Sequence, residues 1–391
     1  MQPREIRPGV FWVGAVDWDR RLFDSLIPLP EGTSYNAYLV AGSEATVLFE
    51  TVDPTKTDLL LDNLRDVERI DYVVLQHAEQ DHTGSLGAVL ERFPEARLLC
   101  SPKAIELLAA HLHIAADSFT AVQDGEELAL GGKTLRFLHT PWVHWPETMS
   151  TYVVEDKVLL SCDLFGSHLA TSDLFGLDDE VIPAAKRYFA EIMMPLRAAV
   201  KKNLDKLAPL DIEVIAPSHG PLYGNPDAIV AAYREWVEGP PKNLVVIPYV
   251  TMHGSTLVLV ERLSARLIEL GVKVERVDLA SVDLGRLATF LVDAATIVVG
   301  TPTVLTNPHP AVMSALYLAN ALRPKAKFLS VIASYGWASN AIETISSMTS
   351  GIKAETIEPV LVRGLALPED LLLVDRLGEA IAAKHAEAGL I

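Results

Sequence analysis

Four side chains that bind metals stand within six residues in the stretch His77-Ala78-Glu79-Gln80-Asp81-His82. The stretch directly follows the apolar run from Asp71 to Gln76, a pattern that predicts a buried β-strand. Loops at strand ends gather at one edge of a sheet, where binding sites are commonly built. Imidazole and carboxylate groups in such a position indicate a metal site at the end of this strand.

Three further segments place a candidate ligand at or just beyond the end of a β-like apolar run. His144 comes after the run 135–138 and its following loop, Asp163 follows Val158 to Cys162, and His219 follows Ile212 to Ala216. Recurrence in four strand-end settings argues against ordinary polar loops. The full set of predicted ligands is His77, Glu79, Asp81, His82, His144, Asp163 and His219.

The charges of this set favour two metal ions over one. Three carboxylates and a bridging hydroxide balance two divalent ions, and a neutral site is cheaper to bury than a charged one. We expect Asp163 to bridge ions roughly 3.5–4 Å apart, as in other dinuclear sites. The expected groups are His77, Glu79 and His144 for one ion, and Asp81, His82 and His219 for the other.

The spacing H-x-E-x-D-H resembles the metallo-β-lactamase signature H-x-H-x-D-H, with Glu79 in place of a histidine. A carboxylate oxygen is harder than an imidazole nitrogen and shifts the preference from zinc toward iron or manganese. This exchange favours redox chemistry over hydrolysis.

The other histidines and the two cysteines are not predicted to bind the metal ions. We expect His111, His113 and His385 to be structural, whereas His139 and His168 lie near ligands and are equally consistent with an orienting or a structural role. The two cysteines, Cys100 and Cys162, form no C-x-x-C, which excludes a rubredoxin-type iron, an iron–sulfur cluster or a zinc ribbon in this chain. The side chain of Cys162 is expected to point into the core.

Composition excludes several classes of partner. The 391 residues carry a net charge of −18, which argues against nucleic acid and anionic membranes. The segment from Met1 to Pro8 lacks the apolar core of a signal peptide, and no apolar run approaches the ~20 residues of a membrane span. A cytoplasmic protein is expected.

The segment Gly239-Pro240-Pro241, which breaks helices and stiffens the chain, predicts a linker between two differently patterned halves. Strands dominate the early part of the first half, over 10–16, 34–40 and 45–50. In the second half, strands near 244–250, 272–279, 296–300, 327–334 and 357–362 alternate with helices. This alternation predicts a doubly wound, five-stranded parallel sheet.

In such sheets ligands bind at the carboxyl ends of the strands, and three loops there carry small, hydroxyl and aromatic residues. The first precedes a helix and suits a phosphate, and the other two suit a flat isoalloxazine ring. Together they favour FMN. The predicted contacts are Thr251, Met252, His253, Gly254, Ser255, Thr256, Pro302, Thr303, Val304, Asn307, Ser334, Tyr335, Gly336 and Trp337.

Over nearly its full length the chain resembles the flavodiiron proteins, also called A-type flavoproteins, in a form without a fused rubredoxin. The resemblance rests on H-x-E-x-D-H and on the segments 32–38, 144–149, 161–166, 184–188 and 217–221. It implies a metallo-β-lactamase-like αββα sandwich with a diiron centre over residues 1–240, and a flavodoxin-like FMN domain over 244–391. The second and third flavin loops depart from the family pattern at Leu305-Thr306 and Ala338-Ser339.

The resemblance further implies reduction of dioxygen to water, of nitric oxide to nitrous oxide, or of both. The irons would be bridged by Asp163 and a hydroxide or oxo group, and FMN would receive electrons from a rubredoxin-like protein or a reduced deazaflavin. A head-to-tail homodimer, or a dimer of such dimers, would bring the FMN of one subunit to the irons of the other. Two alternatives stay open: a zinc hydrolase fused to a flavodoxin-like module, and an electron carrier whose metal half is only a scaffold.

Overall fold

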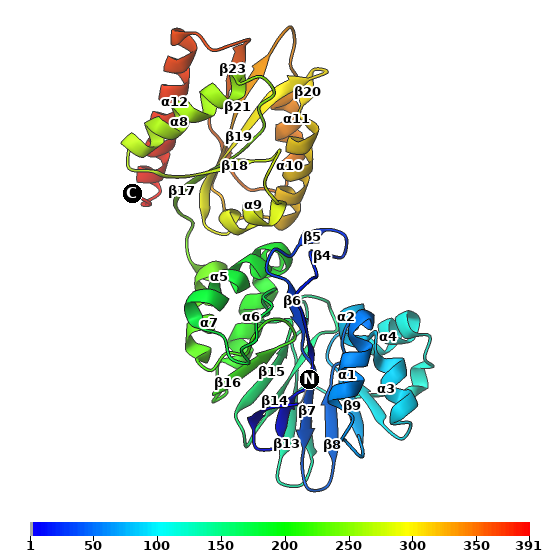
Figure 1. Cartoon of the computed structure of the whole chain (residues 1–391). Helices are drawn as coiled ribbons and strands as arrows, with labels where there is room; N and C mark the ends of the chain where they lie inside the picture. Colours follow the sequence, from blue (N-terminus) through cyan, green and yellow to red (C-terminus); the bar gives the residue numbers. More distant parts are fainter. Residues whose placement is uncertain (1–2) are drawn as a thin grey trace. The chain divides into compact units, whose positions relative to one another are not determined.

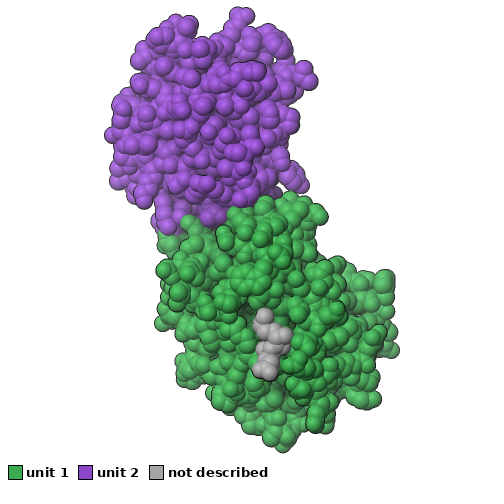
Figure 2. All heavy atoms as spheres, in the orientation of Figure 1, with its two compact units in different colours: residues 1–189, 196–237 green, residues 190–195, 238–391 purple. Residues whose placement is uncertain are grey.

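A computed structural model describes residues 3–391, which divide into two compact units (Figures 1 and 2). Unit 1 comprises the chain up to Phe189 together with Leu196–Val237, and unit 2 comprises Ala190–Pro195 and Glu238–Ile391. Gly239-Pro240-Pro241 follows the last residues of α7 (Pro226–Glu238), next to this division. Met1 and Gln2, which open the segment inspected for a signal peptide, lie outside the described residues.

Unit 1 is built on two sheets. One has seven strands in the order β1-β2-β7-β8-β9-β10-β11, and the other has five in the order β12-β13-β14-β15-β16. Pairing in the second sheet is antiparallel until β15 meets β16 in parallel. The bounds of the first sheet are β1 (Arg4–Arg7), β2 (Val10–Trp12), β7 (Tyr38–Ala41), β8 (Thr46–Phe49), β9 (Tyr72–Leu75), β10 (Arg97–Cys100) and β11 (Phe119–Ala121). Those of the second are β12 (Glu127–Ala129), β13 (Thr134–His139), β14 (Met149–Val153), β15 (Val158–Cys162) and β16 (Val214–Pro217).

Helices cover both outer faces of this pair of sheets, which gives four layers (Figure 1). Along β9, Val73 and Leu75 pack with the helices outside the first sheet, whereas Val74 belongs to the apolar layer between the sheets. The alternation follows from the two-residue period of a strand. The helices are α1 (Thr57–Asn63), α2 (Gln80–Thr83), α3 (Leu86–Arg92) and α4 (Ala104–Leu112) with the first sheet, and α5 (Asp178–Tyr188), α6 (Arg197–Leu207) and α7 with the second.

Short elements complete unit 1. Two small antiparallel pairs join β3 (Ala15–Asp17) to β6 (Thr33–Tyr35), and β4 (Leu22–Phe23) to β5 (Ile27–Pro28). Its 3₁₀ turns are η1 (Pro54–Lys56) and η2 (Ala116–Ser118). The π-helical turn η3 (Phe189–Met193) and the 3₁₀ turn η4 (Met194–Leu196), which follow α5, fall mostly in the short segment Ala190–Pro195 that groups with unit 2.

Two strands expected to be continuous are broken. The expected strand 10–16 divides into β2 and β3 at Gly14, where a Cβ would lie 2.3 Å from the carbonyl oxygen of Tyr35, so the chain passes too close for any side chain. The expected strand 34–40 divides into β6 and β7 at Asn36, whose N–H donates to the carbonyl of Ser218 instead of to a neighbouring strand.

Unit 2 is a parallel sheet with the central order β18-β17-β19-β21-β23. Helices α8 and α12 cover one face, and α9, α10 and α11 cover the other (Figure 1). The strands are β17 (Lys242–Tyr249), β18 (Lys273–Asp278), β19 (Ala294–Val304), β21 (Phe328–Tyr335), β22 (Glu355–Thr356) and β23 (Val360–Arg363). The helices are α8 (Ser255–Glu269), α9 (Leu284–Leu291), α10 (Pro310–Leu322), α11 (Ala341–Met348) and α12 (Pro368–Glu387).

Unit 2 differs from the sequence prediction in two places. The expected last strand, 357–362, is interrupted before β23, because Pro359 has no N–H to donate to a ladder. Strand β19 also runs past Gly300 and turns back as β20 (Asn307–Pro308), through Leu305 and Thr306, which both have positive φ. The second predicted flavin loop is therefore a tight hairpin.

Within residues 3–391, no helix combines the length and the apolar character that crossing a membrane requires.

Candidate functional site

The seven predicted ligands meet at one edge of unit 1, where strands of both sheets end. The stretch from His77 to His82 follows β9 and enters α2, and His144 lies in the loop between β13 and β14. Asp163 directly follows β15, and His219 follows β16. The fold therefore gathers loops that are far apart in the sequence at one place.

The first group of side chains contains His77, Glu79 and His144, together with Asp163. Oε2 of Glu79 lies 3.1 Å from Nε2 of His77 and 3.1 Å from Nε2 of His144. Oδ2 of Asp163 faces the same nitrogens, at 3.5 and 3.3 Å. Each of these groups thus turns a donor atom toward one small volume.

The second group contains Asp81, His82 and His219. Oδ2 of Asp81 lies 3.2 Å from Nε2 of His219, and Oδ1 of Asp81 lies 3.6 Å from Nε2 of His82. The other carboxylate oxygen of Asp163, Oδ1, faces these two nitrogens at 3.4 and 3.3 Å. Asp163 therefore presents one oxygen to each group, the arrangement that a bridging ligand needs.

Several of these donor atoms are buried without a hydrogen bond. Among the described residues, neither carboxylate oxygen of Asp81 or of Asp163 has a hydrogen-bond partner, nor has Nε2 of His82. Buried polar atoms are almost always paired, because leaving them unpaired is costly. Oxygen and imidazole donors left over at the centre of the site fit a pair of metal ions.

The electrostatics of the metal-free site are set by its histidines and carboxylates. Burial by itself lowers the pKa of His144, but contacts with Asp163 and Glu79 raise it to about 10. Burial likewise opposes protonation of His219, and contacts with Asp163 and Asp81 raise its pKa to about 9. The same histidines hold the pKa of Asp163 well below its usual value, against the effect of burial. In the metal-free site, protons on His144 and His219 therefore supply positive charge that balances the carboxylates.

Metal binding is expected to compete with these protons. Because His144 and His219 hold protons below about pH 9 to 10, and the pKa of His82 is also raised by Asp81 and Asp163 against the effect of burial, loading near pH 8 should release at least two protons per chain. Apparent affinity should rise as the pH rises toward 10. Calorimetric titration of metal-depleted protein, in buffers of different ionisation enthalpy, measures this release. Affinity that stays constant over this pH range would contradict the expectation.

Three groups outside the predicted ligand set orient its histidines. Oε1 of Glu147 lies 2.8 Å from Nδ1 of His77, Oε2 of Glu50 lies 3.1 Å from Nδ1 of His82, and the carbonyl oxygen of Ser34 lies 2.8 Å from Nδ1 of His219. Each partner accepts a hydrogen bond from Nδ1, which leaves Nε2 for the centre of the site.

The orienting role of these groups is not evident from the sequence. The only signals are that Glu50 ends a predicted strand and that Glu147 lies in the segment after His144.

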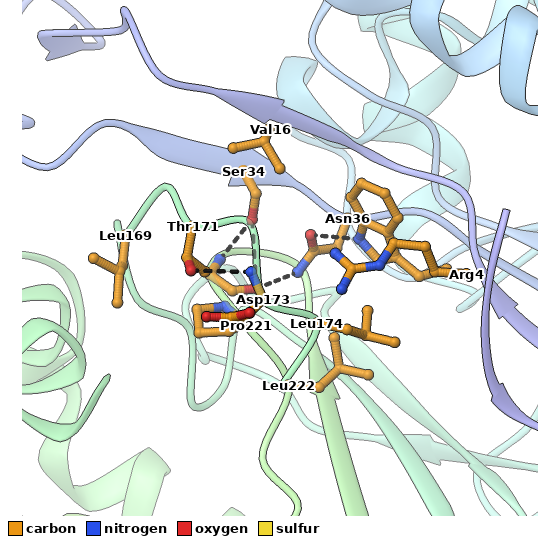
Figure 3. A pocket seen from close by; sticks show the side chains of 12 residues that line it. Arg4, Val16, Ser34, Asn36, Leu169, Thr171, Asp173, Leu174, Pro221 and Leu222 are labelled. Atoms are coloured by element: carbon orange, nitrogen blue, oxygen red, sulfur yellow. Dashed lines mark hydrogen bonds between the residues drawn. The ribbon is translucent and has the colours of Figure 1, made fainter. Parts of the chain in front are cut away.

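The loop that carries His219 is held by Ser34 on β6 and by Asn36 directly after that strand. Both side chains are labelled in Figure 3. Nδ2 of Asn36 donates to the carbonyls of Pro217 and Gly220, at 2.7 and 2.8 Å, and Oδ1 of Asn36 accepts from Trp12. Oγ of Ser34 accepts from the N–H of Gly220 at 2.8 Å. A pocket of only about 20 Å³ lies beside this network, room for one water at most. The network fixes the position of a ligand loop.

The remaining histidines divide between the site and the scaffold. His168 packs against the rings of His219, Tyr188 and Phe23, and its Nδ1 lies 2.9 Å from Oγ1 of Thr33. Burial holds the pKa of His168 well below its usual value, so it is a neutral neighbour of the ligands.

Both His139 and His385 are structural. Nε2 of His139 lies 2.9 Å from the carbonyl oxygen of Val122, away from the ligands. His385 is buried in unit 2 between Thr296 and Asn243.

The contacts of His111 are of the structural kind: its Nδ1 lies 3.2 Å from the carbonyl oxygen of Ala78, and its ring packs on Trp145, which in turn packs on His77. One expectation for this region needs correction. Cys162 is buried, as expected, but it has a positive φ at the end of β15, and its sulfur lies beside His82 and Glu50 and not in a purely apolar core.

In unit 2 the predicted flavin contacts lie at the carboxyl ends of β17, β19 and β21, in the last residues of these strands and in the segments that follow them. The hydroxyls of Ser255 and Thr256, at the start of α8, each lie 3.1 Å from Oγ of Ser334 near the end of β21. Gly254, the N-cap of α8, has φ of +87° and no side chain to cap the helix, and Oγ1 of Thr251 accepts from the N–H groups of Gly254 and Leu257, at 3.1 and 3.4 Å. Amides at a helix N-terminus suit a phosphate group.

Each of the three loops also exposes one large apolar side chain to solvent: Met252, Leu305 and Trp337. Apolar side chains of this size suit the faces of a flat ring. Asn307, predicted as a contact, lies on β20 and uses its amide within the protein, to Leu305 and Thr344.

Comparison with known proteins agrees with this architecture. A family model described as the ODP family beta-lactamase matches residues 33–220. The chain is 36% identical to a nitric oxide reductase of Moorella thermoacetica, across 99% of this chain and 100% of that protein. It also matches the solved structures of the rubredoxin oxygen:oxidoreductase of Desulfovibrio gigas (TM-score 0.94, 30% identity, 98% of each chain) and the flavodiiron protein of Giardia intestinalis (TM-score 0.93, 27% identity, 99% of this chain and 97% of that one).

These matches confirm the fold class predicted from sequence, a lactamase-like sandwich followed by a flavodoxin-like sheet. They also extend over the whole chain, so the resemblance does not rest on the metal half alone. The chain therefore belongs to the flavodiiron protein family.

Proposed function

We propose that the seven ligands hold two iron ions, with Asp163 and a hydroxide or oxo group as bridges. The observation that carries this proposal is that the two carboxylate oxygens of Asp163 face different ligand groups. Oδ2 faces His77 and His144, and Oδ1 faces His82 and His219. Carboxylate and imidazole donors in this mixture suit iron. In the second unit, the three loops after β17, β19 and β21 bind FMN.

The function that this arrangement supports best is reduction of dioxygen to water, of nitric oxide to nitrous oxide, or of both. When bound, a diiron centre supplies electrons to a diatomic molecule, and FMN, which exchanges electrons singly or in pairs, replenishes them. Two of the related proteins named above are a nitric oxide reductase and a rubredoxin oxygen:oxidoreductase, which supports both substrates. Parallel anaerobic assays with each gas and a chemically reduced donor test the proposal.

The residues around the site balance its charge, orient its histidines and limit the access of water. Glu79, Asp81 and Asp163 supply the negative charge that lets two cations sit in a buried position. Glu147, Glu50 and the Ser34 carbonyl keep Nε2 of three histidines turned toward the ions. The rings of Phe23, Tyr188 and His168 line the neighbourhood of His219 and limit access of water to it.

A zinc hydrolase attached to a flavodoxin-like module shares the fold, so metal content separates the two functions. We expect iron at about two ions per chain in protein isolated from cells grown with iron. Zinc-dependent hydrolysis by a protein that holds no iron would favour the hydrolase. The carboxylate of Glu79 beside His77 and His144 supports iron.

We further propose that the working form is a head-to-tail homodimer, or a dimer of such dimers, in the cytoplasm. Leu22, Leu26 and Trp142 are exposed on segments next to the metal ligands, and Met252, Leu305 and Trp337 are exposed on the flavin loops. Burial of such side chains against a second copy would remove them from water. Electrons would reach FMN from a rubredoxin-like protein or a reduced deazaflavin.

Mixed dimers test this assembly. Asp163→Asn should disable the metal centre, and Ser255→Asp should disable FMN binding, because it puts a negative charge at the start of α8 where a phosphate would lie. An acidic residue in the first turn favours the helix, so the fold should persist. After subunit exchange, random mixing should restore about a quarter of wild-type turnover, because half of the dimers contain one intact junction of two.

The control for this experiment is Ser255→Thr, which keeps the hydroxyl and should bind FMN. Electron transfer between subunits would be excluded by confirmed subunit exchange without recovered turnover, or by a fully active monomer.

A further inference from the structure

Two buried glutamates hold the ligand loop between Gln76 and His82 from its two sides. Oε1 of Glu147 accepts from Nδ1 of His77 and also from the backbone N–H of Ala78, at 2.8 and 3.1 Å. Glu50 accepts from the backbone N–H of Gln76 through Oε1, at 2.6 Å, and faces Nδ1 of His82 through Oε2, at 3.1 Å. Each glutamate thus binds one histidine and the backbone beside the loop.

The two glutamates serve different metal groups. Glu147 orients His77, which lies in the group with Glu79 and His144, whereas Glu50 orients His82, which lies in the group with Asp81 and His219. Both side chains are buried, so water cannot replace a contact that is lost.

The glutamates also differ in how many oxygens they use. Glu50 engages both carboxylate oxygens, each with its own donor. Glu147 makes both of its contacts through Oε1, and its Oε2 has no hydrogen-bond partner among residues 3–391. A carboxylate has two acceptor oxygens, whereas an amide has one acceptor and one donor group.

We propose that Glu50 and Glu147 are positioning residues, each for one of the two metal ions, and that Glu50 requires a carboxylate while Glu147 requires only one correctly placed oxygen. The inference rests on the proposed assignment of the seven ligands. Each metal ion would then depend on one glutamate, so a substitution that removes the contacts of either glutamate should weaken the binding of one ion and not of the other.

Substitution by glutamine separates the two roles. In Glu50→Gln, one amide oxygen cannot accept from both Gln76 N–H and His82 Nδ1–H, so the NH₂ group must face one of these donors. The alternative is to move the proton of His82 to Nε2, which removes that nitrogen as a ligand. In Glu147→Gln, the oxygen takes the place of Oε1, and the NH₂ group takes the place of the unpaired Oε2.

The test is the loss of metal from holoprotein challenged with increasing concentrations of a chelator. In Glu50→Gln, half of the bound metal should leave at a chelator concentration about 10- to 100-fold lower than in the wild type, the usual effect of removing an orienting partner. In Glu147→Gln, which loses the same charge, the shift should be less than about threefold. Equal shifts in the two variants would overturn the proposal.

The location of the loosened ion is tested by a second substitution in the same chain. In a His219→Ala background, which already weakens the same group, Glu50→Gln should add little, whereas in a His144→Ala background it should loosen the remaining ion as well. A general structural role for Glu50 predicts the same added loss in both backgrounds, and that result would also overturn the proposal.

Glu147→Ala keeps the proposal testable if Glu50→Gln does not fold. Alanine has no acceptor for His77 or Ala78, so one ion should be loosened about 10- to 100-fold, although glutamine at the same position is tolerated. Identical behaviour of the alanine and glutamine variants would contradict the acceptor argument. A wild-type protein that binds fewer than two ions would instead count against the proposed function.

Discussion

Replacing Asp163 by Asn should remove most of the bound metal and nearly abolish reduction of either gas. Asp163 faces both ligand groups, with one carboxylate oxygen toward each. An amide leaves the centre one negative charge short, and its NH₂ group cannot bridge. We expect turnover to fall by more than about 100-fold, since removal of even an outer partner of a metal ligand costs up to this factor.

Metal analysis, turnover and the flavin spectrum of the same preparation check this expectation. The flavin spectrum should persist, because FMN is assigned to the other unit. Asp211→Asn is a matched control, since Asp211 pairs with Lys157 at the surface of unit 1 and should leave metal content unchanged. A variant that keeps two irons and normal turnover would mean that another group forms the bridge.

The second large effect is expected from Glu79→His. The substitution restores the three-histidine spacing H-x-H-x-D-H and replaces the oxygen that now lies 3.1 Å from Nε2 of both His77 and His144. Zinc accepts such a nitrogen-rich set, whereas iron loses its hard anionic donor. We expect turnover with either gas to fall by at least about 10- to 100-fold, with zinc replacing iron in the protein.

The fold should survive this substitution, because Glu79 precedes α2 without capping it through its side chain. Circular dichroism checks that the fold is preserved. Metal analysis of protein produced with both iron and zinc supplied checks that zinc replaces iron. Glu213→His, on the surface near Lys157, is the control. Unchanged turnover with unchanged iron would refute Glu79 as a ligand.

The convergence of the seven candidate ligands on one place could be predicted because it depends on local patterns. Each of the four segments shows its own apolar run and its own polar end, and the fold then brings the ends to one edge. The alternation of strands and helices in unit 2 is equally local, which is why its parallel sheet was predictable.

What could not be predicted depends on contacts between distant segments. Glu50 and Glu147 face their histidines only after separate strands have come together in the fold. The residues around each glutamate in the sequence do not indicate that contact. The breaks at Gly14 and Asn36 likewise arise from the close approach of other chain segments. The partner of His111 could not be predicted either, because the carbonyl of Ala78 belongs to a segment far away in the sequence.

The support of the His219 loop has a consequence for biosynthesis. Nδ1 of His219 bonds to the carbonyl of Ser34 across 185 residues of chain, and Asn36 fixes the two ends of the same loop. A nascent chain that has not yet emerged past this loop can offer the ligands around His77 but cannot complete the second group. Iron delivered during translation would meet half a site, so stable insertion has to wait until the ribosome has released most of unit 1.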